Sequence, residues 1–159
     1  MTPAVEIAKK SGVDFDLHSY PHDEGAGAYG LEAAEKMDVP AAQIFKTLVI
    51  EGDGGGLAVA IVPVTCQLSL KRAAKALGFK KAKMAAAADV ERATGYVLGG
   101  VSPLGQKKRL PTVLDASADA FGKIYVSAGK RGLEISMAPA DLGRLTGACM
   151  HDIAEGETE

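Results

Sequence analysis

Aromatic residues are scarce in this sequence, which has no tryptophan, four tyrosines and four phenylalanines among its 159 residues. Proteins that bind single-stranded nucleic acid without regard to sequence stack successive bases on aromatic side chains. A stacking platform of this kind is therefore not expected. An RNA bound by this chain would be held by its backbone and by one end.

Cysteine and histidine are also scarce. Cys66 and Cys149 are the only cysteines and lie far apart, which excludes a disulfide framework and a CxxC metal or redox motif. We expect Cys149 to be a small core residue. His18 and His22 flank Tyr20, but a strand and a proline separate them, so the helical i, i+4 geometry of a metal pair is not available. We therefore predict no metal and no cofactor.

Long apolar runs are absent as well. No run reaches 18 residues, so we expect no membrane-spanning helix and no membrane partner. Residues 1–6 lack the basic start and apolar core of a signal peptide. With so little cysteine, these absences favour a protein of the reducing cytoplasm.

The net charge of −2 conceals an asymmetry along the chain. Residues 1–60 hold 4 Lys/Arg against 10 Asp/Glu, residues 61–151 hold 14 against 6, and the last eight residues hold four carboxylates alone. A basic region of this size can hold a phosphodiester backbone. Five cations beside glycine-rich segments are the predicted RNA contacts: Lys107, Lys108, Arg109, Lys130 and Arg131. For the basic cluster in residues 71–75, a solvated helix face is the favoured interpretation.

Alternation, capping residues and glycine stops predict a series of short elements. We expect helices over 3–11, 31–37, 40–44, 70–77, 87–94 and 139–145, and strands over 13–20, 47–51, 57–62, 83–84, 112–115, 123–127 and 133–137. Helices and hairpins are interspersed without a βαβ rhythm. The prediction is an α+β single domain over residues 1–153, with a mixed β-sheet covered by short helices. Residues 154–159 are predicted to form an acidic, frayed tail.

The most informative segment is residues 99–105 (GGVSPLG), followed at once by residues 106–109 (QKKR). Glycines let a backbone approach a ligand closely, while Pro103 stiffens the loop and biases Ser102 toward extended geometry. A stiff loop of N–H donors beside fixed positive charge suits an enzyme that binds a phosphorylated substrate and stabilises an oxyanion. An ordinary turn beside a solvated basic run is the alternative.

Lys46 stands at the entry to the apolar strand over 47–51. It is either a surface charge at a strand end or a cation aimed into a pocket, where Lys46 and Thr47 could hold a phosphate or carboxylate. No nucleophile is evident, because Cys66 has no histidine near it in sequence and Ser127 lacks the flanking pattern of a nucleophile elbow. An enzyme built from these residues would work by positioning and oxyanion stabilisation, with the substrate supplying part of the chemistry.

Three segments resemble the YbaK/EbsC family, free-standing relatives of the editing domain of bacterial prolyl-tRNA synthetase. They are residues 45–48 (FKTL), 94–105 (TGYVLGGVSPLG) and 125–133 (YVSAGKRGL). The likeness covers nearly the whole chain and is greatest to the branch that clears Cys-tRNA(Pro). It implies an editing-domain fold and a deacylase activity. Such an activity is needed because a hydrophobic pocket separates near-isosteric amino acids poorly.

The resemblance also implies site residues. The family's catalytic positions fall on Lys46, Gly99 and Gly100, with the two glycine amides forming an oxyanion hole and Lys46 holding the terminal phosphate or ribose. The substrate-binding positions fall on Tyr20, Tyr29, Thr47, Ser102, Pro103, Ser127 and Glu134. Tyr29 stands where relatives often carry Phe, and Glu134 where some carry Asp, so the size and polarity of the pocket stay open.

In the cysteine-specific branch, the thiol of the substrate is thought to attack its own ester carbonyl and leave as a thiolactone. The resemblance therefore implies ester cleavage without a nucleophile from the chain. It also implies aminoacyl-tRNA as the partner, presented by prolyl-tRNA synthetase in a ternary complex. Two alternatives stay open. One is a deacylase for tRNA that carries Ala, Ser or Thr, and the other is a non-catalytic module that binds tRNA or a synthetase.

Overall fold

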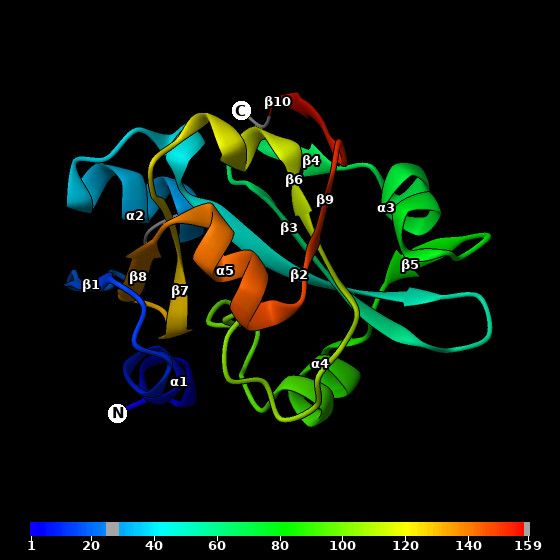
Figure 1. Ribbon diagram of the computed structural model, residues 1–159, viewed down its shortest axis with the longest axis horizontal. Coiled ribbons are helices and arrows are strands. Elements are labelled where there is room, and N and C mark those ends of the chain that lie inside the picture. Colours follow the sequence, from blue (N-terminus) through cyan, green and yellow to red (C-terminus); the bar gives the residue numbers. More distant parts are fainter. Residues whose placement is uncertain (25–28, 158–159) are drawn as a thin grey trace.

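Two antiparallel β-hairpins organise the fold, which is known here from a computed structural model (Figure 1). The structure describes residues 1–24 and 29–157, with the side chains of Tyr29 and Glu157 outside the description. The first hairpin joins β2 (Phe45–Gly52) to β3 (Leu57–Pro63), and the second joins β7 (Ile124–Lys130) to β8 (Leu133–Met137). Both hairpins were predicted from their glycine-rich turns.

The first hairpin is the centre of a five-stranded mixed sheet with the order β5-β2-β3-β6-β9. The three added strands are β5 (Ala82–Met84), β6 (Thr112–Asp115) and β9 (Cys149–His151). β6 runs parallel to β3 and to β9, whereas the other pairs are antiparallel. The predicted α+β class with a mixed sheet is confirmed.

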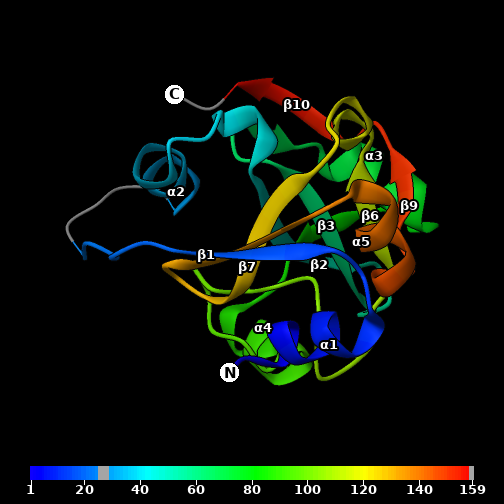
Figure 2. The ribbon, with the colours of Figure 1, turned by 60° about the vertical axis from the view of Figure 1, so that its left-hand side comes forward.

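The second hairpin continues into a three-stranded antiparallel sheet, because β1 (Phe15–Ser19) pairs with β8. β1 and β7 pass across the near face of β2 and β3 in Figure 2. Ile44, just before β2, forms an isolated parallel bridge with Tyr125 of β7. This bridge ties the edge of one sheet to the other.

Five α-helices within the described residues cover the sheets: α1 (Pro3–Ser11), α2 (Tyr29–Met37), α3 (Leu70–Leu77), α4 (Ala87–Thr94) and α5 (Pro139–Thr146). Two 3-10 turns accompany them, Ala41–Gln43 and Ala116–Ala120. Thr2 and Ser69 cap α1 and α3 by accepting backbone N–H hydrogen bonds. The helices lie close to their predicted bounds.

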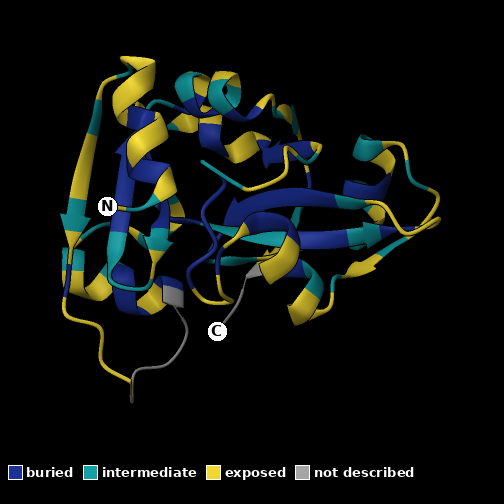
Figure 3. Cartoon of the chain, turned by 90° about the horizontal axis from the view of Figure 1, so that it is seen from below, coloured by how far each residue is buried: buried dark blue, intermediate teal, exposed yellow. Residues whose placement is uncertain are grey.

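The apolar interior divides into three clusters. The largest lies between the two sheets and includes Phe45, Ile61 and Val126. A second lies under α3, and a third lies under α2, where Tyr20 and Tyr125 are buried. Buried strands at the centre and exposed residues on the helices and loop ends are visible in Figure 3. β3 is buried on both faces, as its lack of alternation predicted.

Three expectations about local structure were wrong. Residues 154–157 form a strand, β10 (Ala154–Glu157), instead of beginning a frayed tail, because β10 pairs with β4 (Cys66–Leu68) and Asp115 accepts the N–H groups of Ile153 and Ala154. Cys149 is exposed on the edge strand β9 and is not a core residue. β1 is shorter than predicted and largely exposed, since it too is an edge strand.

Candidate active site

A polar face of the three-stranded sheet brings predicted site residues together. Ser127 of β7 lies directly opposite Glu134 of β8, and Glu134 lies opposite His18 of β1. Directly paired residues of neighbouring strands share one face of a sheet. Tyr20 follows β1 by one residue and packs with Tyr125 of this face in the cluster under α2. Tyr20, Ser127 and Glu134 therefore line one region.

Tyr20 carries a hydroxyl group that is available to a ligand. The residue is 6% exposed, and its hydroxyl has no hydrogen-bond partner among the described residues. Burial raises the pKa of Tyr20 to about 12, and the neighbouring Glu134 and Glu32 carboxylates add to this effect. The phenol therefore stays protonated at neutral pH. A buried donor that is not satisfied by the protein is destabilising unless a ligand or water accepts from it.

Lys46 reaches this region from β2. The isolated bridge between Ile44 and Tyr125 is parallel. Lys46 and Ser127 each stand two residues beyond it, on the side of their strands that carries the bridged residue. Burial lowers the pKa of Lys46, and the nearby Cys66 group acts in the opposite direction. Cys66 stands at the start of β4, and its closeness to Lys46 was not foreseen. Only the return of β3 alongside β2 brings the two residues together.

Thr47 projects to the opposite face of β2 from Lys46, because successive side chains of a strand alternate. Its cross-strand partner is Ile61 of the main core, whereas that of Lys46 is Val62 of the cluster under α3. The Thr47 hydroxyl is buried and has no hydrogen-bond partner among the described residues. The expectation that Lys46 and Thr47 act side by side on one ligand group is therefore not supported.

The glycine loop begins with a tight turn after α4. The Gly100 N–H donates to the Val97 carbonyl at 3.0 Å, and Gly99 has a φ of +90°, which an L side chain rarely adopts. The Gly100 amide is thus already used within the turn and does not support the expected oxyanion role. Gly99 is exposed, and a Cβ placed there would meet nothing within 4 Å.

The rest of the loop is held by its own hydrogen bonds. The buried Tyr96 hydroxyl donates to the Leu104 carbonyl at 2.6 Å, the Leu104 N–H donates to Ser102 Oγ at 3.2 Å, and Gln106 Nε2 donates to the Ser102 carbonyl at 3.0 Å. Ser102 is 0% exposed, and Pro103 is buried beside a separate cavity of about 130 Å³. These bonds fix the shape of the loop, and the predicted substrate contacts of Ser102 and Pro103 stay predictions.

The predicted RNA-contacting cations fall into two environments. Lys107, Lys108, Arg109 and Lys130 are exposed. Arg131 is different, because its Nε donates to Glu32 at 3.1 Å. Its charge is therefore used within the protein, and the prediction that Arg131 binds RNA is not supported by its contacts.

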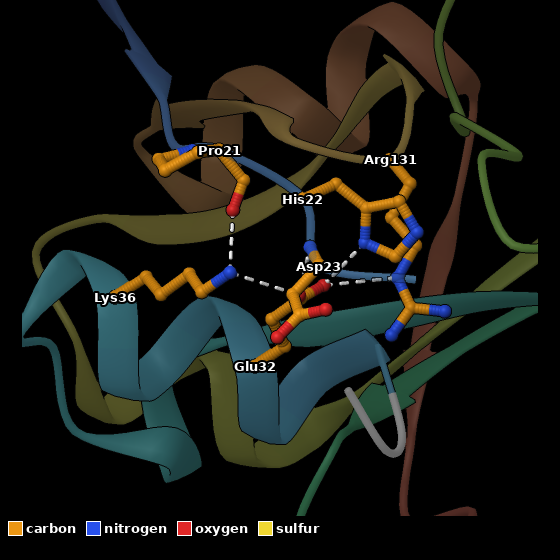
Figure 4. A network of polar contacts seen from close by, with 6 residues as sticks. All are labelled: Pro21, His22, Asp23, Glu32, Lys36 and Arg131. Carbon is orange, nitrogen blue, oxygen red and sulfur yellow. Dashed lines mark hydrogen bonds and ion pairs between the residues drawn. The ribbon is translucent and has the colours of Figure 1, made fainter. Parts of the chain in front are cut away.

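Glu32 of α2 is the centre of a network that the sequence analysis missed (Figure 4). Its side chain is 2% exposed and contacts His22 Nδ1 at 2.8 Å, Lys36 Nζ at 3.1 Å and Arg131 Nε at 3.1 Å. It also accepts the Asp23 N–H at 2.9 Å. Burial alone would raise the pKa of Glu32, but these hydrogen bonds outweigh it and hold the pKa at about 2. The network joins α2 to the tip of the β7–β8 hairpin. In the sequence, only the i, i+4 spacing of Glu32 and Lys36 gave a signal.

The described residues hold neither a cluster of metal ligands nor a membrane-spanning helix. No three His, Cys, Asp or Glu side chains in that part of the chain gather as metal ligands. None of its helices has the length and apolar character needed to span a bilayer. Tyr29 of α2 has its side chain outside the described residues, so the predicted contact of that residue stays a prediction.

Comparison with known proteins gives the family. The model of the aminoacyl-tRNA editing domain matches residues 26–145. The chain belongs to the aminoacyl-tRNA editing domain family. Among curated members, it is 40% identical over 148 residues to EbsC of Enterococcus faecalis, a proposed Cys-tRNA(Pro)/Cys-tRNA(Cys) deacylase. The match covers 89% of this chain and 90% of EbsC. YwhH of Bacillus subtilis, which is uncharacterised, is 28% identical over 72% of this chain and 73% of its own.

A solved structure extends the match to the fold of the editing family. It belongs to a proposed trans-editing enzyme for prolyl-tRNA synthetase, with a TM-score of 0.84 and 25% identity over 98% of this chain and 99% of that chain. The α+β prediction and the resemblance to editing domains are therefore confirmed. Within this editing domain, the region around Tyr20, Lys46, Ser127 and Glu134 is the candidate site.

Proposed function

We propose that this protein is a trans-editing deacylase that removes cysteine from mischarged Cys-tRNA(Pro). The observation that carries the proposal is the 40% identity to EbsC across nearly the whole of both chains. The candidate site supports it, because Tyr20, Ser127 and Glu134 lie in one region and Lys46 follows the Ile44–Tyr125 bridge that joins β2 to this region. A substrate that brings its own nucleophile needs only to be positioned by such a site.

The proposed reaction uses the thiol of the cysteinyl group. Its sulfur attacks the ester carbonyl carbon, a C–S bond forms, and the C–O bond to the terminal ribose breaks. The thiol proton passes to the released ribose oxygen, so atoms balance without water. The products are free tRNA and a cyclic thiolactone.

The chain's role in this step is to orient the ester and to stabilise negative charge. Lys46 would hold the terminal phosphate or ribose. The protonated Tyr20 hydroxyl and the exposed Gly99 amide are the donors that remain for the developing oxyanion, since the Gly100 N–H is used in its turn. Exposed Lys107, Lys108, Arg109 and Lys130 would contact the tRNA backbone, and prolyl-tRNA synthetase would present the tRNA in a ternary complex. This activity would be exerted in the cytoplasm.

Deacylation of three esters tests the proposal. Purified wild-type protein, Lys46→Ala and the exposed control Lys75→Ala would be compared on Cys-tRNA(Pro), Ala-tRNA(Pro) and Ser-tRNA(Pro). We expect rapid loss of the cysteine ester alone, abolished only in Lys46→Ala, with circular dichroism showing that this variant is folded. Full activity of a folded Lys46→Ala protein would contradict the assigned role of Lys46.

The two alternatives give different results in the same assay. Loss of the alanine or serine ester would indicate another amino acid specificity and water as the nucleophile. Loss of no ester, with tRNA binding retained, would indicate a non-catalytic module.

A further inference from the structure

Val97 and Leu98 are exposed apolar residues on the loop that rests against the β7–β8 hairpin. Their exposures are 61% and 59%, higher than those of all other large hydrophobic residues in the described chain except Met1. The two residues stand together in the turn, just before Gly99, and both side chains are exposed to solvent there. We call this exposed pair the apolar patch. Rigid exposed apolar patches on soluble domains commonly mark interaction sites.

The loop after α4 holds Val97 and Leu98 in this exposed position through its hydrogen bonds and its contact with the β7–β8 hairpin. The Gly100 N–H closes the turn onto the Val97 carbonyl, and Tyr96, which precedes the pair, is buried and bonded to the Leu104 carbonyl. A Cβ on Gly100 would lie 2.9 Å from Lys130 Cα, so the turn rests directly on the β7–β8 hairpin. Val97 and Leu98 are therefore held in the solvent, where they cannot turn inward without breaking these contacts.

The charge around the patch has one sign. Residues 94–111 contain three cations and no carboxylate, and residues 127–133 contain two cations and no carboxylate. Arg131 is bonded to Glu32, but Lys107 and Lys130 are exposed and make no salt bridge within the described residues. Lys107 is the first residue of the basic run 107–109. Its N–H donates to the carbonyl of Thr94, the last residue of α4, so the loop returns to that helix at Lys107.

We propose that Val97 and Leu98, flanked by Lys107 and Lys130, form a docking surface for the single-stranded 3′ end of an RNA. Apolar base faces would pack on the two aliphatic side chains, and the lysines would contact the phosphates between them. Lys130 and Ser127 belong to the same strand, β7, so an RNA strand on the patch would extend along β7 and bring its terminal nucleotide toward the candidate site. This inference rests on the proposed function and adds the penultimate nucleotides to the recognised substrate.

The composition of the surface favours RNA over a protein partner. Protein interfaces concentrate aromatic residues and arginine at a buried centre and are depleted of lysine. Here the apolar contact is small, and the large hydrophobic side chains that are exposed among the described residues include no aromatic one. Lys107 and Lys130, which flank the patch, make no salt bridge in the described part of the chain. Unpaired cations around a small apolar patch complement a polyanion with flat bases.

The test compares a long and a short substrate. The double variant Val97→Ser/Leu98→Ser would be assayed on cysteinyl-tRNA and on the cysteinyl ester of adenosine, which lacks the penultimate nucleotides. We expect KM for the tRNA to rise about tenfold, as loss of a buried apolar contact predicts, with kcat and the adenosine ester unchanged. Leu17→Ser, at an exposed position of β1, is the matched control. It should leave the kinetics on both the tRNA and the adenosine ester unchanged. Equal loss on both esters, or no loss on the tRNA, would overturn the proposal.

A binding measurement separates this inference from the proposed activity. Fluorescence anisotropy with an unacylated RNA oligonucleotide that ends in CCA needs no chemistry, so it reports on the surface even if no ester is cleaved. We expect the double variant to bind about tenfold more weakly, and Lys130→Ala to lower the slope of log K against log salt by about one. Unchanged RNA binding, or a defect seen only in complexes with prolyl-tRNA synthetase, would show that the surface binds no RNA end.

Discussion

Gly100 rests on the backbone of Lys130, where a Cβ would approach Lys130 Cα to 2.9 Å and Arg131 N to 3.3 Å. The loop after α4 and the β7–β8 hairpin therefore meet at a point that has no room for a side chain. This contact sets the position of the glycine loop relative to Ser127, which lies on the same hairpin.

Gly100→Ala should consequently displace the loop from the hairpin. We expect a free energy of unfolding lower by about 1–3 kcal/mol, because the added methyl group meets backbone atoms that cannot rotate away. Deacylation should also slow. Gly122→Ala is the control, since a Cβ there would meet nothing within 4 Å. Thermal unfolding and deacylation rates measure the two effects, and equal behaviour of the variants would contradict the tight contact.

Cys66 should shift the alkaline limit of activity through its effect on Lys46. Burial already lowers the pKa of Lys46 from the ordinary 10.5, and the Cys66 group raises it. Replacing Cys66 by Ala removes the raising effect, so the Lys46 ammonium loses its proton at lower pH. If this ammonium binds the substrate, kcat/KM of Cys66→Ala should fall at lower pH than that of the wild type. Cys149→Ala, at an exposed site, should follow the wild-type profile after subtraction of uncatalysed ester hydrolysis.

Glu32 should contribute to stability only above acid pH. Its folded pKa of about 2 is below the ordinary 4.5, so its stabilising effect is complete above pH 4.5 and is lost as pH falls toward 2. Glu32→Gln should therefore be less stable than the wild type at neutral pH, and the difference should shrink across this window. Glu35→Gln, at an exposed position of the same helix, is the control. Urea unfolding at a series of pH values would measure the difference, and a gap that stays constant with pH would contradict the prediction.

Tyr20→Phe should separate stability from activity. The Tyr20 hydroxyl is buried without a partner among the described residues, and an unsatisfied buried polar group costs about 1–3 kcal/mol. We expect the variant to be at least as stable as the wild type, with kcat/KM reduced if the hydroxyl donates to the ester. Chemical denaturation and ester kinetics on one preparation give both values. A variant that is less stable yet fully active would show that the hydroxyl serves the fold.

Local signals predicted the elements well. Thr2 and Ser69 predicted the first residues of two helices, and the glycines of the turns predicted both hairpins. Lys46 could be singled out because a lone cation opens an apolar strand. Such features depend on residues a few positions apart, so they are visible in the sequence itself.

What could not be predicted depends on contacts between distant residues. The sequence around Arg131 indicates a nucleic-acid contact, but the Arg131 guanidinium donates a hydrogen bond to Glu32, which lies 99 positions away. The Gly100 N–H is an exception, because its acceptor, the Val97 carbonyl, is close in sequence, and no residue pattern indicated the turn between them. Cys149 looked like a core residue, and only the sheet order places it on an exposed edge.

The pairing of β10 with β4 joins segments that lie far apart in the sequence. β4 carries Cys66, the neighbour of Lys46, and its partner strand is formed by residues 154–157. Pairings between distant segments form slowly, because a long loop must close before they gain any contact. The strand beside Lys46 is therefore expected to find its partner later in folding than β2 and β3, which pair across a short turn.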